Sequence, residues 1–328
     1  MRAAVARELG GPEVVRVEQV DPPPLLPGTA RVQVAAAAVN FPDLLVLAGT
    51  YQAKVAAPYT PGCEFSGRVL EVADGVERVR AGDLVFGLAT HGAFAEQVVL
   101  DAARLTPVDR PVDPQVLAAF SVTYTTAYHA LRTFARVQPD EHVTVLGAAG
   151  GVGLASVDLA SAMGARPIAV GGDPAKLEAC LERGAVALVD YDREDLKARL
   201  NELTGGGADV VVDPVGGRYS EPALRAMRWG GRYVVVGFAA GEIPRIPLNL
   251  VLLKGVWVVG FENRTILDHL PELAAAHRAE VLDLLLAGRV SPRISSVHPL
   301  EDVVGALREV ADRRAIGKVV VQVADGPV

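Results

Sequence analysis

Hydrophobic and polar positions follow two different patterns along the chain. Up to about residue 110, short runs of alternating apolar residues are separated by Gly, Pro and Asp turns. This pattern is typical of β-strands joined by short connections. We therefore expect a β-rich first part with strands at 30–34, 67–72, 83–86 and 95–100.

From about residue 140, β-branched runs alternate with segments whose apolar residues recur at helical spacing. Such alternation predicts right-handed βαβ units around a parallel sheet. The expected strands are 142–147, 167–170, 186–189, 208–213 and 232–238. The expected helices are 152–163, 174–183, 193–203 and 219–227.

After residue 261 the pattern becomes mixed, with helices expected at 269–286 and 303–311 and a strand at 318–323. This tail is too short for a domain of its own, so we expect it to return to the first domain. A chain of 328 residues is long enough for about two domains. The predicted class is α/β, with a β domain and a doubly wound parallel sheet.

Composition narrows the possible partners. Half of the residues are hydrophobic and 22% are charged, which provides for a large core. The net charge is −7 and only 5 of the 32 basic residues are Lys, so nucleic acid is not an expected partner. Two cysteines exclude a disulfide scaffold and a zinc site built from four thiolates. No apolar stretch reaches the length of a membrane span and no signal core is present, so we expect a soluble cytoplasmic protein.

A glycine-rich segment joins strand 142–147 to helix 152–163. Gly147, Gly150 and Gly153 are spaced three apart, and Ala148 stands where the commoner Gly-x-Gly-x-x-Gly begins. Small residues let the backbone approach a pyrophosphate, which the helix N-terminus attracts. A tight turn without a ligand is the alternative. The expected cofactor contacts are Gly147, Ala149, Gly150, Gly151, Val152 and Gly153.

The end of the next strand bears on which dinucleotide is bound. An NAD site usually places Asp or Glu there to hold the ribose 2′-hydroxyl. Gly171 stands there instead, and the ammonium of Lys176 could pair with a 2′-phosphate. Asp173 precedes Pro174, so its other interpretation is a helix N-cap, and Lys176 could simply be solvated. NADPH is the predicted cofactor.

Several motifs occur together in a specific order: 39–43, 61–67, 122–128, the glycine loop, 213–217, 230–233 and 317–320. With these motifs, the chain resembles the medium-chain dehydrogenase/reductase superfamily, in its zinc-independent quinone oxidoreductase branch, over essentially its whole length. The resemblance implies a GroES-like catalytic domain at 1–118 and 264–328 and a Rossmann NADPH-binding domain at 119–263. It also implies a homodimer formed through the last Rossmann strand, at 256–261.

The resemblance also bears on zinc. Zinc alcohol dehydrogenases of this superfamily have Cys, His and Cys as catalytic ligands, and the matching positions here are Asn40, Cys63 and Val122. A catalytic zinc needs about three good ligands, so no metal is expected. Cys63 is then most simply a small buried residue.

Three residues are implied on the substrate side, namely Tyr51, Asn40 and Asp43. The Tyr51 loop resembles one in enoyl thioester reductases, where a Tyr is proposed to deliver a proton. Tyr51 could equally be an aromatic wall of the pocket. Asn40 could orient the substrate or make a local turn contact, and Asp43 could make a structural hydrogen bond at a helix start.

On the cofactor side, the resemblance places Thr126 at the nicotinamide carboxamide and Tyr191 beside the adenosine phosphate. Phe238 and Phe261 follow strand ends, where cofactor loops belong, and buried ring packing is their alternative. Many relatives have an aromatic residue after Phe261, whereas this chain has Glu-Asn-Arg at 262–264, which either makes the pocket more polar or faces solvent.

Without zinc, an alkoxide has no Lewis acid to stabilise it, so the expected acceptor is already activated by conjugation. The predicted function is an NADPH-dependent quinone oxidoreductase. Two alternatives stay open: a reductase of activated C=C bonds in enals, enones or enoyl thioesters, and a binding protein that holds NADPH without turnover.

Overall fold

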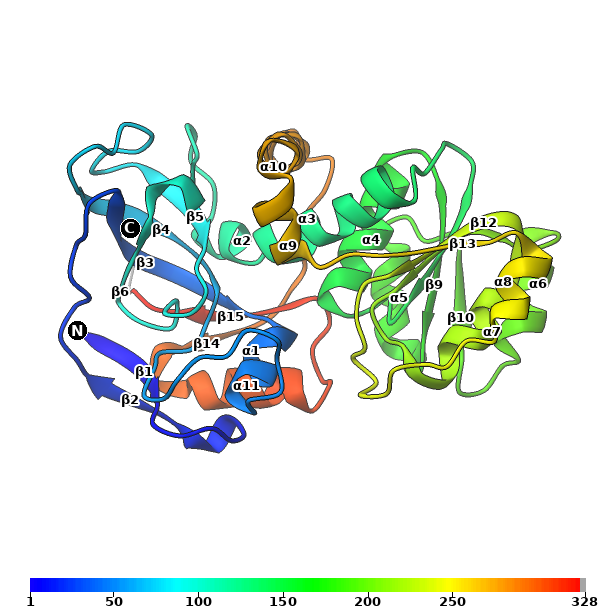
Figure 1. Ribbon diagram of the computed structural model, residues 1–328, viewed down its shortest axis with the longest axis horizontal. Helices are drawn as coiled ribbons and strands as arrows, with labels where there is room; N and C mark the ends of the chain where they lie inside the picture. The colour runs from blue at the N-terminus through cyan, green and yellow to red at the C-terminus, as the bar shows by residue number, and fades with distance from the viewer. Residues whose placement is uncertain (325–328) are drawn as a thin grey trace. The chain divides into compact units, whose positions relative to one another are not determined.

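The computed structural model describes residues 1–324 and forms two compact units (Figure 1). The first unit combines residues 1–122 with the chain from Pro292 onward, and the second is Thr123–Ser291. These boundaries differ from the predicted ones, because residues 264–291 group with the second unit. Their helix α10 (Pro271–Leu286) buries His277, whose Nδ1 lies 3.0 Å from that of His129 in the second unit.

Antiparallel pairing dominates the first unit. Its main sheet has the order β14-β15-β3-β4-β5-β7, and β6 also pairs with β3. A separate antiparallel pair is formed by β1 and β2. The strands are β1 (Arg2–Ala6), β2 (Val15–Gln19), β3 (Thr29–Val39), β4 (Glu64–Val72), β5 (Leu84–Leu88), β6 (Gln97–Asp101), β7 (Leu105–Pro107), β14 (Ile294–Pro299) and β15 (Lys318–Gln322).

The C-terminal return predicted from the sequence is made by β14 and β15, whereas helix α10 groups with the second unit. Strand β15 lies antiparallel to β3, with Val319 opposite Val39, and β14 pairs in parallel with β15. Short helices complete the first unit: η1 (Pro12–Val14), α1 (Phe41–Leu47), η2 (Ala102–Arg104), α2 (Pro114–Ala118), η5 (Leu300–Asp302) and α11 (Val303–Ala311).

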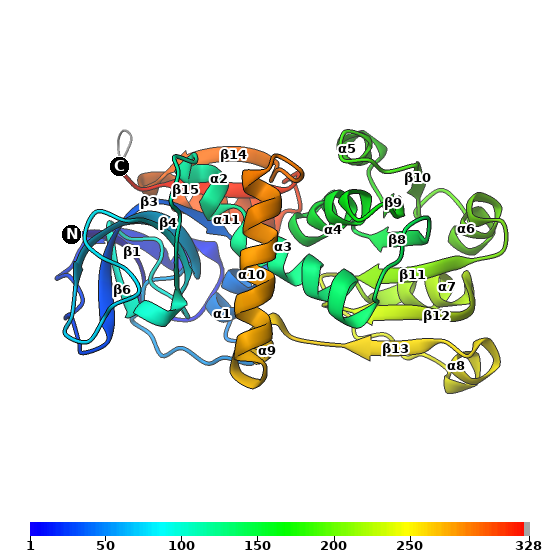
Figure 2. The ribbon, with the colours of Figure 1, turned by 90° about the horizontal axis from the view of Figure 1, so that it is seen from above.

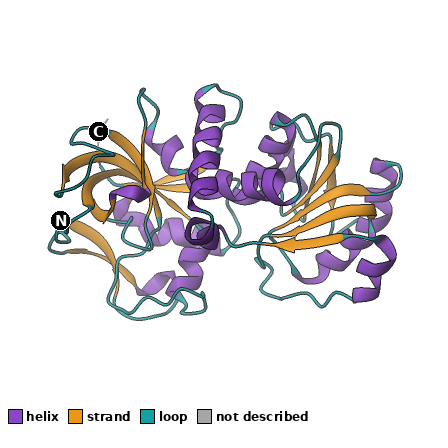
Figure 3. Ribbon diagram, turned by 45° about the horizontal axis from the view of Figure 1, so that its top comes forward, coloured by secondary structure: helices purple, strands orange, loops and turns teal. Residues whose placement is uncertain are grey.

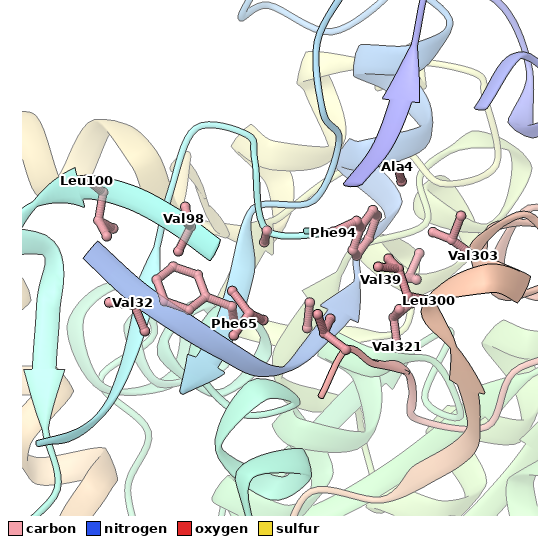
Figure 4. Close-up of a cluster of buried hydrophobic side chains, with 14 of the residues drawn as sticks. Ala4, Val32, Val39, Phe65, Phe94, Val98, Leu100, Leu300, Val303 and Val321 are labelled. Carbon is pink, nitrogen blue, oxygen red and sulfur yellow. The ribbon is translucent and has the colours of Figure 1, made fainter. Parts of the chain in front are cut away.

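The core of the first unit lies around β3 and β4 (Figure 4). Phe65 and Phe94 are fully buried there, together with Val32, Val321 and Leu300. Burying an aliphatic or aromatic side chain of this size contributes about 1.5–3 kcal/mol. The core therefore anchors the C-terminal end of β3, from which the candidate site begins.

The second unit is a parallel sheet of order β10-β9-β8-β11-β12-β13 (Figure 2). The chain starts at β8, moves outward to β10, and then returns to build β11 to β13 on the other side. This reversal is the doubly wound topology expected from the sequence. The strands are β8 (His142–Leu146), β9 (Arg166–Gly171), β10 (Ala187–Asp190), β11 (Ala208–Asp213), β12 (Met227–Val235) and β13 (Trp257–Gly260).

Helices connect these strands (Figure 3). They are α3 (Ser121–Tyr128), the π-helix η3 (His129–Phe134), α4 (Gly151–Ala162), α5 (Pro174–Leu181), α6 (Leu196–Thr204), η4 (Gly217–Tyr219), α7 (Ser220–Arg225), α8 (Leu248–Lys254), α9 (Asn263–His269) and α10. Within the described part of the chain, no helix is both long and apolar enough to cross a bilayer.

One predicted strand was misplaced. Strand β12 begins at Met227 rather than at residue 232 and ends at Val235. Gly230 and Gly231 stand just before the predicted start of the strand, and Gly230 has φ +75°. Both glycines lie in an irregular part of β12, because its pairing with β11 shifts register between Met227 and Arg232.

Candidate active site

The first candidate region begins where β3 ends and α1 starts. Asn40 is the N-cap of α1, and its backbone N–H donates to Asp43 Oδ2 at 2.8 Å. Pro42 stands in the first turn of the helix, where its missing N–H costs nothing. The structural hydrogen bond that was the alternative for Asp43 is therefore present.

The Asn40 side chain is held at both ends of its amide. Its Nδ2 donates to Glu64 Oε2 at 3.0 Å and to the carbonyl of Ala38 at 3.2 Å. Its Oδ1 accepts from Lys318 Nζ at 2.6 Å. Cys63 Sγ lies 3.7 Å from the same Nδ2. This fixed amide is buried, with 4% of its surface exposed.

Glu64 and Lys318 form a buried ion pair beneath Asn40. Lys318 Nζ lies 3.0 Å from Glu64 Oε2 and donates to the Val39 carbonyl at 3.0 Å. The second carboxylate oxygen of Glu64 accepts from the backbone N–H of Val122 at 2.6 Å. A buried pair of charges needs such additional hydrogen bonds to offset desolvation. Sequence reasoning did not assign either residue to the site, although a Lys in the apolar run 318–323 and a Glu before Phe65 were the available signals.

Two further groups of this region have shifted pKa values. Burial raises the pKa of the Asp43 carboxyl to about 6, against the hydrogen bond from Asn40 and the charge of Lys318. Burial, with the negative charges of Asp43 and Glu64, raises the pKa of the Cys63 thiol well above its ordinary value. The raised pKa favours the thiol form of Cys63 over the nucleophilic thiolate.

These residues do not fit a catalytic zinc ion. The three positions implied as ligands hold the amide of Asn40, the thiol of Cys63 and the apolar side chain of Val122, and the Lys318 ammonium brings a positive charge against the amide. Among residues 1–324, no group of three or more His, Cys, Asp or Glu side chains is arranged to hold a metal.

A small pocket lies beside this network. Asp43 lines it together with Val46, Tyr59, Pro61, Gly62, Thr90 and His91. Tyr59 and His91 meet edge to face, with ring centroids 5.8 Å apart. Tyr51, expected on the substrate side, lies in the loop after α1, where its backbone N–H donates to the Leu45 carbonyl at 3.1 Å. Sequence reasoning missed Tyr59 and His91.

The glycine loop in the second unit fits a pyrophosphate. A Cβ at Gly153 would lie 2.2 Å from the Gly147 carbonyl oxygen, so only Gly allows helix α4 to approach β8 so closely. Gly147 has φ +59°. Helix α4 starts after Gly150, which has no side chain to cap it. The first N–H groups of α4 beside Ala149, Gly151 and Val152 can therefore receive an anion.

The end of β9 has the features expected from the sequence. Gly171 packs against Leu177 without a carboxylate, since a Cβ there would lie 3.0 Å from Leu177 Cδ2. Asp173 caps α5, its side chain accepting from the backbone N–H of Ala175 at 3.1 Å, which confirms the N-cap interpretation. Lys176 Nζ lies 4.0 Å from Asp173 Oδ2. Its ammonium therefore stays near the strand end.

The segments that follow β10 and β11 contribute two aromatic rings that stack on each other. Tyr191 stacks on Tyr219, with ring centroids 3.7 Å apart and an interplanar angle of 21°. Tyr219 Oη donates to Asp192 Oδ1 at 2.9 Å, and Arg218 Nη2 lies 2.5 Å from the same oxygen. Asp192, Arg218 and Tyr219 were missed in the sequence, although their positions just after β10 and β11 are where a doubly wound fold builds its site.

The other three residues predicted to contact the cofactor are Phe261, Phe238 and Thr126, and they differ in exposure and in their neighbours. Phe261 stacks on Phe134 at 4.7 Å between centroids, which is the ring packing given as its alternative. Phe238 is 38% exposed and lies against Gly216. Thr126 is buried in α3, and the neighbouring Thr125 Oγ1 accepts from Asn263 Nδ2 at 3.3 Å.

Comparisons with known proteins cover both units. Residues 26–110 match the alcohol dehydrogenase GroES-like domain, and residues 151–276 match a model described as zinc-binding dehydrogenase. That second description names zinc, whereas the positions implied as zinc ligands in this chain hold Asn40, Cys63 and Val122.

Individual relatives span nearly the whole chain. A quinone oxidoreductase-like protein 2 from Bos taurus is 40% identical over 321 residues, which are 97% of this chain and 91% of that protein. The Escherichia coli quinone oxidoreductase solved with NADPH is 26% identical, with a TM-score of 0.92 over 98% of this chain and 100% of that one. A Thermus thermophilus quinone oxidoreductase, also studied with NADPH, is 32% identical, with a TM-score of 0.85 and the same coverage. The chain therefore belongs to the medium-chain dehydrogenase/reductase family of oxidoreductases, among its quinone oxidoreductase-like members.

Proposed function

We propose that this protein is an NADPH-dependent reductase that passes hydride to a quinone or a similar conjugated acceptor without zinc. The observation that carries the proposal is the Asn40–Lys318–Glu64 network. At Asn40, a position implied to match a zinc ligand of relatives that use zinc, this network holds an amide against an ammonium and its carboxylate. A fixed side-chain charge cannot exchange ligands or bind an alkoxide as an open metal position does.

NADPH, the conjugated acceptor and the protein each contribute to the proposed reaction. Bound NADPH would supply the hydride from the nicotinamide C4. A conjugated acceptor spreads the incoming charge onto its own oxygen, so a few hydrogen bonds suffice to stabilise it. Because the Asn40 amide is held at both ends, it acts by positioning. We assign proton donation to Tyr51, and the loop after α1 carries it.

Residues at the end of β9 and in helix α5 support NADPH rather than NADH as the cofactor. Gly171 itself carries no carboxylate to repel a 2′-phosphate, and the ammonium of Lys176, which can pair with one, lies 4.0 Å from Asp173 Oδ2 just beyond β9. The glycine loop supplies backbone N–H groups for the pyrophosphate, and Thr126, Tyr191 and Phe238 complete the proposed cofactor contacts. Structural neighbours that include the Escherichia coli and Thermus thermophilus quinone oxidoreductases were solved with NADPH.

The second candidate, reduction of activated C=C bonds, is favoured by Tyr51. A proton donor is needed at the α-carbon of an enone, whereas hydroquinone oxygens can take protons from water. Initial rates with quinones, enones, enals and enoyl thioesters, each with NADPH and with NADH, separate the two functions. A higher kcat/KM for C=C substrates than for every quinone would favour the second.

We also propose that the protein forms a homodimer through β13. This edge strand exposes 68% of Trp257, and the preceding helix α8 exposes 79% of Leu248, 80% of Leu252 and 72% of Leu253. An exposed edge strand beside a large apolar patch is typical of an interface. Sedimentation should give a dimer that Leu252→Glu converts to a monomer. The control Leu181→Glu, on α5, should leave the dimer intact. A monomeric wild type would contradict the proposal.

The cytoplasmic location stays a prediction.

A further inference from the structure

We propose that Arg218, together with Lys176, binds the adenosine 2′-phosphate of NADPH. Before the phosphate binds, Asp192 holds the Arg218 guanidinium beside the end of β9. The inference rests on the proposed use of NADPH and adds residues that the motifs did not include. It makes the Asp192–Arg218 pair a determinant of cofactor specificity.

The first step is the position of Asp192. A Cβ built on Gly172 would lie 2.3 Å from Asp192 Oδ2 and 3.0 Å from the Tyr191 ring. The carboxylate of Asp192 therefore lies directly against the backbone at the end of β9. In a doubly wound fold this is the point at which the adenosine ribose is read.

The second step is the position of Arg218. It belongs to η4, which follows β11, and its Nη2 contacts both Asp192 Oδ1 and Tyr219 Oη, at 2.5 and 2.9 Å. The guanidinium carbon lies 4.9 Å from the centroid of the Tyr219 ring. Tyr219 in turn stacks on Tyr191. These contacts place the guanidinium beside Asp192, whose other carboxylate oxygen faces Gly172.

The third step is the capacity of the guanidinium to take a phosphate. Its contacts with Asp192 and Tyr219 use only Nη2, so the other nitrogens of the planar fork are left to donate. The Arg218 side chain is 72% exposed and that of Asp192 is 40% exposed. Exposed ion pairs of this kind are weak, so a doubly charged phosphate can compete with the carboxylate.

The fourth step concerns the opposing charges. Asp192 pairs with Arg218, and Asp173 lies 4.0 Å from Lys176. Asp190, which accepts from the Asp192 backbone N–H, is itself paired with Arg193. The Asp173 carboxylate is occupied in capping α5. Asp192 is consequently the charge that most directly opposes a phosphate, and its removal should strengthen phosphate binding while leaving Arg218 in place.

The test is calorimetric titration of the full-length protein with 2′,5′-ADP and 5′-AMP, which differ only in the 2′-phosphate, and with NADPH and NADH. The variants are Arg218→Gln and Asp192→Asn. Arg225→Gln is the matched control, since Arg225 on α7 is half-exposed and pairs with Glu221 at 2.7 Å. All three remove one charge.

We expect Arg218→Gln to weaken 2′,5′-ADP and NADPH by roughly 10–100-fold and to change 5′-AMP and NADH less than about twofold. Asp192→Asn should tighten 2′,5′-ADP by at least about threefold, and added salt should shrink both differences. Arg225→Gln should bind every nucleotide like the wild type.

Equal weakening of 2′,5′-ADP and 5′-AMP by Arg218→Gln, or no weakening, would overturn the inference. So would a loss of 5′-AMP and NADH binding in Asp192→Asn without a gain for 2′,5′-ADP, because the carboxylate would then read the ribose hydroxyls. If the wild type bound none of the four nucleotides, the proposed function itself would fail. Wild-type binding with an indifferent Arg218→Gln refutes only the role of Arg218.

Discussion

The ammonium of Lys318 lies 3.0 Å from the carboxylate of Glu64, and their side chains are only 5% and 0% exposed. The two residues are 254 positions apart in the chain. Their pairing joins β15 to the start of β4 and holds the Asn40 amide between them. The candidate site is therefore built on a contact that exists only in the folded protein.

Breaking this pair should destabilise the protein strongly. Lys318→Met or Glu64→Gln leaves one buried charge without its partner, which typically costs about 3–5 kcal/mol. Urea unfolding followed by circular dichroism measures the loss. The double variant should cost less than the sum, because it leaves no unpaired charge. As a control, Arg7→Gln removes the exposed Arg7–Glu18 pair and should change the urea midpoint little. Additive losses in the double variant would show that the two charges are not coupled.

Lys176→Ala should weaken NADPH and spare NADH. A charge-assisted hydrogen bond contributes about 1.5–3 kcal/mol, which corresponds to roughly a ten- to a hundredfold change in affinity. Quenching of intrinsic fluorescence, or calorimetry, gives the two dissociation constants. Equal losses for both cofactors would mean that Lys176 does not read the phosphate.

Two buried histidines of the second unit should make stability depend on pH. His129 and His277 face each other with Nδ1 atoms 3.0 Å apart. Burial lowers the pKa of both, that of His129 from 6.5 to about 4, helped by the charges of His277 and Arg278. The folded state keeps His129 neutral while the unfolded chain takes up a proton, so stability is complete above about pH 6.5 and is lost as pH falls toward 4. For His129 the loss should reach up to about 3 kcal/mol.

The measurement is the urea midpoint across this pH range in the wild type and in His129→Gln. The variant should lose much of the pH dependence, whatever its stability at neutral pH. His269→Gln, which changes an exposed ring on α9, should retain it. A pH profile of His129→Gln parallel to that of the wild type would contradict the assignment.

Tyr51→Phe tests the proposed proton donor. Turnover of enones should fall by about 10²–10⁴-fold, the usual range for loss of a general acid. Quinone turnover should suffer less, because water can protonate the hydroquinone oxygens. Tyr59→Phe removes another tyrosine hydroxyl of the first unit and serves as the comparison. Unchanged enone rates in Tyr51→Phe would reduce Tyr51 to a wall of the pocket.

Features with local sequence signals could be predicted. Strand β11 (Ala208–Asp213) and helix α11 (Val303–Ala311) lie at the predicted residues, because β-branched runs and helical periodicity act over a few positions. The N-cap role of Asp173 followed from the Asp-Pro pair in the same way. The glycine loop combined spacing with a strand–turn–helix context.

Features that depend on distant residues could not be predicted. Strand β12 begins at Met227, before Gly230 and Gly231, because Met227 pairs with Ala208 of β11, a contact that the local sequence does not indicate. Nothing near Glu64 in the sequence indicates Lys318 as its partner. Likewise, Asp192 and Arg218 meet only because the loops after β10 and β11 come together at one edge of the sheet.

The most direct test of the account is hydride transfer by metal-free protein. The protein is treated with a chelator, its zinc content is measured by elemental analysis, and NADPH oxidation is followed with a quinone and with a conjugated enone. Oxidation of ethanol by NADP⁺ is measured in parallel. The account predicts negligible zinc, unchanged reduction of a conjugated acceptor after chelation, and no measurable ethanol oxidation. One zinc per chain that is required for activity, or ethanol oxidation at rates rivalling quinone reduction, would contradict it.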